Sequence, residues 1–199
     1  MKVKAVIHIQ TTQLSHFSSF EGILHDQTNI TEVWLADIGT HHNKSGKRIA
    51  ALPIIAAILE KYTTNANPIF QNKSYSGSKI AIAISDQPVG IDIEFINQTF
   101  DYNDMLTECF SAEEISEITN HKDFFKGWTR KEALLKATKL GITDEIKLIP
   151  TSDGEHELPS VLGNYQNDWN VYTITTDGYQ LTVASAHKQE NIKYYQFTF

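Results

Sequence analysis

Residues 89–96, VGIDIEFI, alternate apolar and acidic side chains, as a β-strand with two unlike faces does. Ile91 and Ile93 fall on one face of an extended chain, whereas Asp92 and Glu94 fall together on the other. At a rise of roughly 3.3 Å per residue the two carboxylates are about 7 Å apart, so they repel each other unless a cation lies close to both. The strand therefore predicts a positively charged partner on its acidic face.

A second segment, FFKGWTRKEALLK at 124–136, has the apolar spacing of a helix and raises the same question. At about 100° per residue Glu132 lies on the same apolar stripe as Trp128, and Lys136 follows one turn later. A carboxylate on the core side of a helix costs free energy unless it is paired or coordinated. A buried Glu132–Lys136 pair would satisfy this carboxylate. Taken together, however, the three carboxylates of the two segments favour Mg²⁺, which prefers oxygen ligands.

The composition describes an ordinary globular protein of 199 residues, with 41% hydrophobic and 21% charged residues, which allows one domain or two small ones. A formal net charge of −7 argues against general nucleic-acid binding. No apolar run reaches the roughly 18 residues of a membrane helix, and the first residues lack the apolar core of a signal peptide. Cys109 is the one cysteine, which predicts a reducing compartment. We therefore expect a cytoplasmic protein without a membrane partner.

Strand and helix signals alternate along the chain. Apolar periodicity predicts helices over 46–62 and 123–140, and the pair Ser111 and Glu114 predicts a capping box that begins another helix. β-rich runs predict strands over these ranges: 2–10, 33–39, 79–85, 88–96, 169–176, 179–187 and 192–199. The turn signal SDQP at 85–88 predicts that the strands on either side of it form a hairpin. A polar stretch at 97–104 is the expected seam between two halves.

Two segments carry candidate contacts for anions. The stretch NKSYSGSK at 72–79 offers hydroxyl and backbone N–H groups, and we interpret it as a serine-rich loop, a feature that is usually only a turn. A basic run lies in the otherwise acidic chain and favours a local anionic ligand or partner, the alternative being a solvated helix face. Its cations are Lys122, Lys126, Arg130, Lys131, Lys136 and Lys139.

The order of SYSG at 74–77, VGIDIE at 89–94 and WTRKEALLKA at 128–137 resembles the 4′-phosphopantetheinyl transferases. It is similar in particular to the surfactin-synthetase-activating type, in which two similar halves lie in one chain. The resemblance implies an α/β (α+β) fold with halves at 1–100 and 101–199. Each half would be a long helix on a mainly antiparallel sheet, the two would be related by a pseudo-two-fold axis, and the protein would be a monomer.

Matched residue by residue, the resemblance implies that Asp92, Glu94 and Glu132 hold Mg²⁺. Lys136 matches the lysine that meets the pyrophosphate of coenzyme A, and Asp92 also belongs to the coenzyme A site. Glu132, directly or through a metal-bound water, is the candidate base for the acceptor hydroxyl. Glu132 and Lys136 are thus the expected catalytic residues.

Further coenzyme A contacts follow from the same resemblance. Ser74 and Tyr75 occupy the family's S-H-S positions, where the histidine touches a phosphate. Lys47 and Arg48 lie near the family's basic contact for the 3′-phosphate. The sequence departs from the pattern at two places: Tyr75 replaces the histidine, and Lys139 stands where a glycine is frequent.

The implied reaction transfers 4′-phosphopantetheine from coenzyme A to a serine of an apo acyl or peptidyl carrier protein and releases adenosine 3′,5′-bisphosphate. Carrier proteins of this kind are usually acidic, so the basic run would serve docking. Two alternatives remain open. One is a catalytically silent homologue that binds coenzyme A or a carrier protein, and the other is an Mg²⁺-dependent phosphohydrolase that uses water as the acceptor.

Overall fold

The computed structural model describes residues 17–18, 29–41, 43–62, 70–139, 144–152, 154–158 and 169–198. The strands are β1 (Phe17–Ser18), β2 (Thr31–Asp37), β3 (Phe70–Ser76), β4 (Lys79–Ser85), β5 (Val89–Phe95), β6 (Gly154–His156), β7 (Trp169–Thr176), β8 (Tyr179–Ser185) and β9 (Ile192–Phe197). The α-helices are α1 (Lys44–Leu59), α2 (Asn103–Cys109), α3 (Ala112–Glu117) and α4 (His121–Thr138), and 3₁₀ turns follow at Glu60–Tyr62, Asp144–Leu148 and Gln189–Asn191.

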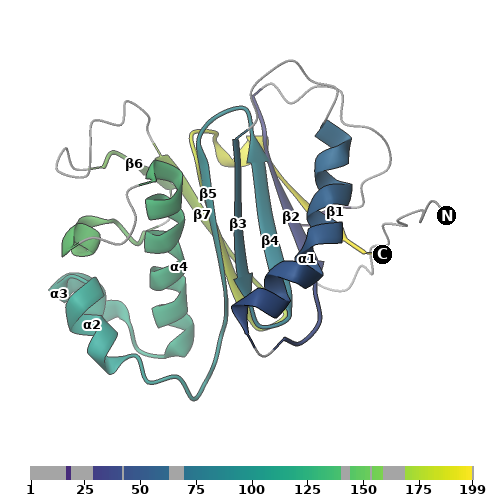
Figure 1. The fold of residues 1–199 in the computed structure, drawn as a ribbon. Helices are drawn as coiled ribbons and strands as arrows, with labels where there is room; N and C mark the ends of the chain where they lie inside the picture. Colours follow the sequence, from purple (N-terminus) through teal and green to yellow (C-terminus); the bar gives the residue numbers. More distant parts are fainter. Residues whose placement is uncertain are drawn as a thin grey trace.

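These strands form two sheets that are in contact, with β3 of one sheet beside β5 of the other (Figure 1). The first sheet has the order β1-β9-β2-β4-β3, and the second has the order β5-β8-β7-β6. In the first sheet β9 runs parallel to β1 and β2, whereas the pairs within the second sheet are antiparallel. The expected mixed α+β class is confirmed, and the pseudo-two-fold relation stays a prediction.

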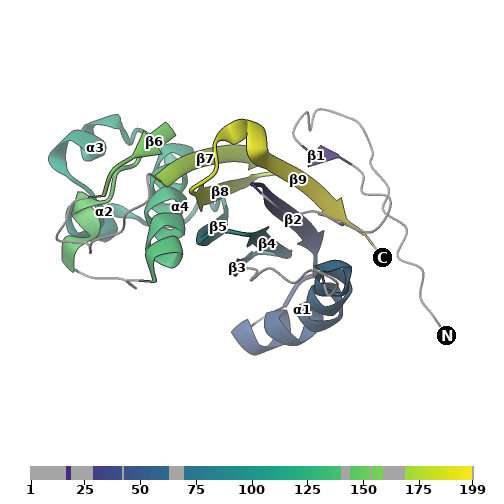
Figure 2. The same cartoon turned by 90° about the horizontal axis from the view of Figure 1, so that it is seen from above.

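Helix α1 covers one face of the first sheet, as Figure 2 shows from above. Ile54 and Ile58 of α1 are buried in one cluster with Trp34 of β2 and Ile82 of β4. The helix begins where Asn43 accepts a hydrogen bond from the backbone N–H of Gly46 through its side chain, which is an N-cap. The predicted helix at 46–62 is confirmed.

The other face of the first sheet packs on the second sheet. Because side chains alternate along a strand, Val33 and Leu35 of β2 face away from α1. They share one buried cluster with Ile91 and Ile93 of β5 and with residues of β8. The apolar face predicted for residues 89–96 is thus the one that enters the core.

The predicted hairpin between residues 79–85 and 88–96 is wrong. Strand β4 already has β2 on one edge and β3 on the other, so it offers no free edge to β5. The hairpin partner of β4 is β3, joined through a turn in which Gly77 has a φ of 52°. This also corrects the predicted loop at 72–79, most of which is strand β3.

As a result, the sheets exchange strands across the expected seam. Strand β5 pairs with β8, which comes from the later part of the chain, and β9 pairs with β2, which comes from the earlier part. The halves at 1–100 and 101–199 stay a prediction. The predicted strand at 2–10 lies outside the described residues. Among the helices that the structure describes, none is long and apolar enough to cross a membrane.

Candidate active site

Strands β3 and β5 meet at the seam between the two sheets through side chains. Ser74 and Ser76 of β3 are two residues apart, so both face β5. The hydroxyl of Ser74 donates to Asp92 Oδ1 at 2.7 Å, and the hydroxyl of Ser76 donates to Glu94 Oε2 at 2.6 Å. The acidic face of β5 is thus supplied with hydrogen-bond donors from the neighbouring strand.

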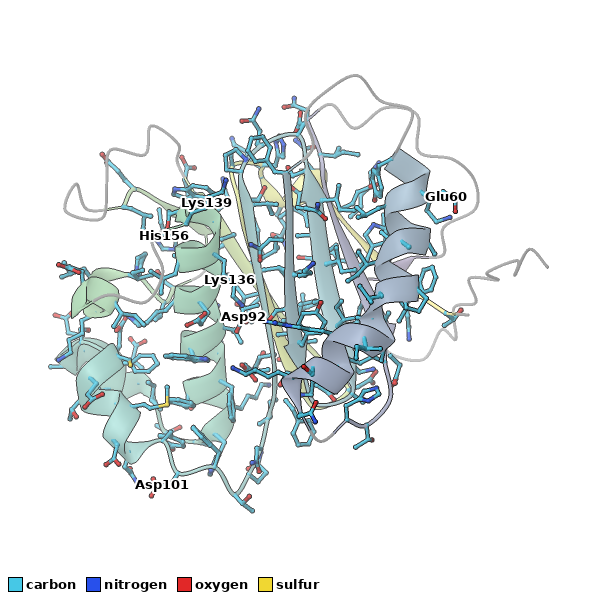
Figure 3. The ribbon with its side chains drawn as sticks, in the orientation of Figure 1. Glu60, Asp92, Asp101, Lys136, Lys139 and His156 are labelled. Atoms are coloured by element: carbon cyan, nitrogen blue, oxygen red, sulfur yellow. The ribbon has the colours of Figure 1, made fainter. Side chains whose placement is uncertain are left out.

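The positively charged partner that the strand pattern predicts is the side chain of Lys136. Its Nζ lies 2.6 Å from Asp92 Oδ1, 3.2 Å from Ser74 Oγ and 4.0 Å from Glu132 Oε2. In Figure 3 Lys136 reaches from α4 toward Asp92. One ammonium group therefore lies between a carboxylate of β5 and a carboxylate of α4, at the place where the two motifs predict Mg²⁺.

A close approach of α4 to β5 makes this geometry possible. A Cβ atom on Gly90 would overlap the carbonyl oxygen of Ala133 and come within 2.5 Å of the backbone nitrogen of Ala137. Glycine is the residue that permits such an approach of one backbone to another. Gly90 thus brings the helix that carries Glu132 and Lys136 onto the strand that carries Asp92.

The three carboxyl groups perturb one another. Burial raises the pKa of Asp92, and the charge of Lys136 opposes this rise. Burial and then the charge of Asp92 raise the pKa of Glu94 to about 7, against a hydrogen bond from Ser76. Burial and the charge of Asp92 also raise the pKa of Glu132. Three ionised carboxyl groups this close repel one another, so a cation bound among them would stabilise their charged forms.

The chemistry of the donor set fits a divalent cation. Asp92 is 2% exposed, and its Oδ2 is buried without a hydrogen-bond partner among the described residues. Such an atom carries a desolvation cost that a metal ion would remove. Within the described ranges no three acidic, histidine or cysteine side chains already stand in a metal-binding arrangement. The ligand set of Asp92, Glu94 and Glu132 stays a prediction.

The raised pKa values predict how the stability of the metal-free protein depends on pH. The folded protein binds a proton at Glu94 more tightly than the unfolded chain does, so this group stabilises the fold at low pH. That contribution is lost as the pH rises through the folded pKa of about 7. We expect the unfolding temperature in EDTA to fall between about pH 5 and about pH 8, and the fall to be smaller in Glu94→Gln. Parallel profiles of the two proteins by scanning fluorimetry would contradict this.

A pocket of about 730 Å³ opens beside this cluster. That volume is in the range of sites for small molecules and cofactors. The predicted residues that line it are Lys47, Arg48, Ser74, Tyr75 and Lys136. Lys136 therefore belongs both to the pocket and to the carboxylate cluster, and the coenzyme A contacts expected from separate motifs lie in one place.

Two further cations line this pocket, Lys44 and Lys73, which are not among the site residues predicted from the sequence. Lys44 precedes Lys47 and Arg48 by three and four residues, a spacing that places all three on one helix face. This signal was present in the sequence. Lys73 belongs to a strand that was interpreted as a loop, so its direction could not be inferred.

Tyr75 also lines the pocket, at the position where the family pattern has histidine. Burial raises its pKa, and the charge of Arg48 opposes the rise, so the two side chains are close enough to interact. The phenol therefore stays neutral at physiological pH. It can donate one neutral hydrogen bond there but no charge.

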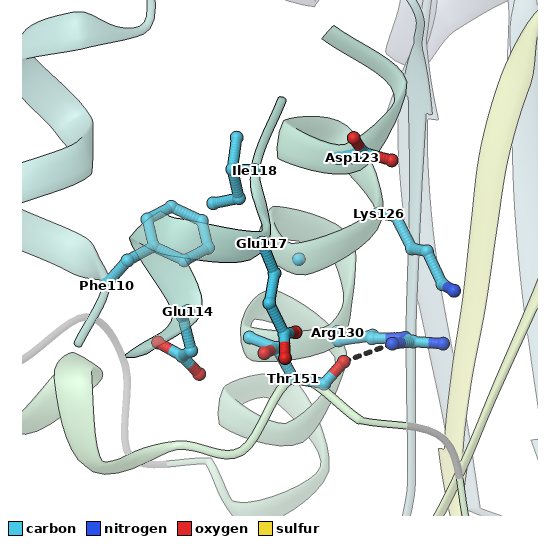
Figure 4. A pocket seen from close by; sticks show the side chains of 9 residues that line it. Phe110, Glu114, Glu117, Ile118, Asp123, Lys126, Arg130 and Thr151 are labelled. Atoms are coloured by element: carbon cyan, nitrogen blue, oxygen red, sulfur yellow. Dashed lines mark hydrogen bonds between the residues drawn. The ribbon is translucent and has the colours of Figure 1, made fainter. Parts of the chain in front are cut away.

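The basic run is only partly a surface feature, which corrects the sequence analysis. Lys131 is 0% exposed, pairs with Glu114 at 2.9 Å and donates to the carbonyl oxygens of Ile146 and Ile149. Arg130 is also buried and donates to the carbonyl oxygen of Thr151, in a small pocket of about 120 Å³ shown in Figure 4. Both cations hold α4 to its neighbours and so cannot dock a partner.

A comparison with known protein families matches the part of the chain that carries the carboxylates and Lys136. Residues 88–184 match the model of the 4′-phosphopantetheinyl transferase superfamily. This match covers just under half of the chain and confirms the predicted resemblance. The matched residues contain the three carboxylates Asp92, Glu94 and Glu132, and also Lys136.

Individual relatives carry the same description. The chain is 31% identical over 141 residues to the 4′-phosphopantetheinyl transferase psf-1 of Bacillus pumilus. The aligned residues cover 59% of this chain and 59% of the relative. It is 36% identical over 76 residues to the 4′-phosphopantetheinyl transferase AcpT of Salmonella typhi, covering 35% of this chain and 40% of the relative. AcpT of Escherichia coli K12 is 38% identical over 76 residues, covering 35% of this chain and 39% of the relative. The matches thus span about three fifths and about two fifths of these relatives.

Proposed function

We propose that the protein transfers 4′-phosphopantetheine from coenzyme A to a serine of an apo acyl or peptidyl carrier protein, with Mg²⁺, and releases adenosine 3′,5′-bisphosphate. The observation that carries this proposal is the position of Lys136, which joins a basic pocket to a carboxylate cluster. A substrate with several phosphates needs the basic pocket to bind them, and its reacting pyrophosphate needs the cation that the carboxylates would hold. The names of the relatives support the same reaction.

The basic pocket suits the phosphates of coenzyme A. Its cations are Lys44, Lys47, Arg48, Lys73 and Lys136, contributed by α1, β3 and α4. We assign Lys47 and Arg48 to the 3′-phosphate and Lys136 to the pyrophosphate. Leu52 and Ile55 also line the pocket and offer an apolar surface for the adenine or the pantetheine arm.

In the transfer step the serine oxygen forms a bond to the β-phosphorus, and the bond from that phosphorus to the bridging oxygen breaks. The electron pair leaves with adenosine 3′,5′-bisphosphate. Glu132 takes the serine proton, directly or through a water molecule. Mg²⁺ held by Asp92, Glu94 and Glu132 would neutralise charge on the pyrophosphate. Lys136 binds the leaving oxygens, and positioning of this kind is the main requirement of phosphoryl transfer.

The acceptor docks, in this proposal, beside the exposed part of the basic run. Lys122 and Lys139 are exposed, so these two cations can contact an acidic carrier protein. We propose that the enzyme acts as a monomer, because one chain supplies every residue of the proposed site. We also propose that it is cytoplasmic, because a single cysteine suits a reducing compartment.

The direct test incubates the protein with Mg²⁺, coenzyme A and a panel of apo carrier proteins. The intact mass of each carrier should rise by one phosphopantetheine. Binding of coenzyme A without transfer to any carrier would support a silent homologue instead. Hydrolysis of coenzyme A without a protein acceptor would support a phosphohydrolase.

Tyr75→His is expected to lower the Michaelis constant for coenzyme A. A charge-assisted hydrogen bond contributes about 1.5–3 kcal/mol and a neutral one about 0.5–1.5 kcal/mol, so the gain is about tenfold. It should be largest below about pH 6.5, where an unperturbed imidazole is charged. Titration of coenzyme A at several pH values, with Tyr75→Phe as the matched control, measures this effect. If Tyr75→Phe binds as wild type and the histidine gives no gain at low pH, Tyr75 makes no phosphate contact.

A further inference from the structure

Ser76 is joined to β5 by two hydrogen bonds that fix the direction of its proton. Its hydroxyl oxygen accepts from the backbone N–H of Phe95 at 2.9 Å, and its O–H donates to Glu94 Oε2 at 2.6 Å. A hydroxyl has a single proton. The N–H of Phe95 binds one lone pair of the Ser76 oxygen. The single O–H of Ser76 then points to the carboxylate of Glu94.

Ser76 belongs to a row of three side chains that replaces a backbone ladder between β3 and β5. Asn72 Oδ1 accepts from the backbone N–H of Ile91 at 3.3 Å, and Ser74 and Ser76 bind the two carboxylates. The two strands belong to different sheets and are not paired by their backbones. The position of the β5 carboxylates relative to the pocket therefore depends on these side chains.

Glu94 is the carboxylate that most needs such an anchor. Its side chain is longer than that of Asp92 and is only half-buried, and the charge of Asp92 repels it. Without a donor it would lower this repulsion by rotating toward solvent. The Ser76 hydroxyl, held by Phe95, opposes that rotation.

We propose that Ser76 is a positioning residue that holds Glu94 in the orientation in which it can share a cation with Asp92 and Glu132. Ser76 is 7% exposed and is not among the described residues that line the basic pocket, whereas Ser74 is among them. Ser76 is therefore expected to affect the transfer reaction only through Glu94, not by contact with coenzyme A. The role in transfer rests on the proposed function, but the effect on cation binding does not.

The test compares Ser76→Ala with the wild type in two measurements. One is the Mg²⁺ affinity of the coenzyme A-free protein by isothermal titration calorimetry, and the other is steady-state transfer. Loss of a hydrogen bond that orients a metal ligand costs about 10–100-fold in metal affinity or activity. We expect this loss in Mg²⁺ affinity and in kcat, with the Michaelis constant for coenzyme A within about twofold of wild type.

Two sets of variants separate positioning from folding. Ser78→Ala removes a hydroxyl from the same hairpin that makes only long contacts, at 3.4 Å to Asp37 and Tyr179, and should bind Mg²⁺ as wild type does. Ser76→Thr and Ser76→Val have the same shape and differ in the hydroxyl. Threonine should keep the affinity and valine should lose it. This pair carries the comparison if the alanine variant does not fold.

A double-mutant cycle decides whether Ser76 acts through Glu94. In a Glu94→Ala background, Ser76→Ala should cause no further loss of Mg²⁺ affinity beyond about twofold. A full further loss would overturn the proposal, and so would equal affinities of the threonine and valine variants. If the wild type modifies no carrier protein but its Mg²⁺ affinity depends on the Ser76 hydroxyl, the proposed function fails and the positioning role stands.

Discussion

Asp92→Asn is expected to lower the rate of transfer by about a thousandfold or more while leaving the folded protein at least as stable as the wild type. The asparagine has nearly the same shape but removes the charge that would hold both Mg²⁺ and Lys136. A contribution of about 4 kcal/mol from the cation to the transition state corresponds to this factor. The side chain of Asp92 is 3% exposed, and burial raises its pKa, so its charge costs the fold free energy that the amide does not.

The partner left behind is not stranded by this change. The side chain of Lys136 is 28% exposed and keeps Glu132 within 4.0 Å. Transfer assays and thermal unfolding of Asp92→Asn should be compared with Asp104→Asn, a matched change at an exposed carboxylate. A variant that is much less stable in the absence of metal, or that transfers at the rate of wild type, would show that Asp92 serves the fold and not the reaction.

Gly90→Ala is expected to have the largest effect on stability. The added methyl group would meet the backbone of α4 at Ala133 and Ala137, and backbone atoms cannot rotate away as a side chain can. Overpacking of this kind costs about 3 kcal/mol. In a chain of this size that is a fall of roughly 6–12 °C in the unfolding temperature. The strand and the helix would also separate, so transfer should fall with stability.

Gly46→Ala is the matched control for Gly90→Ala. A Cβ at Gly46 would meet its neighbours at 3.4 Å, which is an ordinary contact, and the residue lies within α1. Alanine is more favourable than glycine in a helix by about 1 kcal/mol, so the unfolding temperature should rise slightly. If Gly90→Ala also unfolds at or above the wild-type temperature, α4 and β5 are not held as closely as described.

Features encoded over a few residues could be predicted from the sequence. The alternation in VGIDIEFI gave both the strand and the face that is buried, because period two leaves no other arrangement for Ile91 and Ile93. The capping box at Ser111 and Glu114 is present as predicted, because both of its hydrogen bonds are local. The position of Glu132 beside Lys136 followed from the helical repeat alone.

Features that depend on distant partners could not be predicted. The signal SDQP is compatible with a hairpin, and only the occupied edges of β4 exclude it. Lys131 looks like its neighbours in a basic run, yet it is buried because Glu114 and two backbone carbonyls lie where its ammonium group ends. The hydroxyls of Ser74 and Ser76 took on meaning only when β3 was found beside β5.

The exchange of strands between the sheets constrains how the chain can fold during synthesis. Strand β2, at residues 31–37, obtains its parallel neighbour from residues 192–197. Until the ribosome has made those residues, one edge of β2 has free backbone N–H and C=O groups that another chain could pair with. Closing a loop of this length also carries a large entropic cost, which slows non-local pairing. The first sheet is thus completed late, although most of its strands are made early.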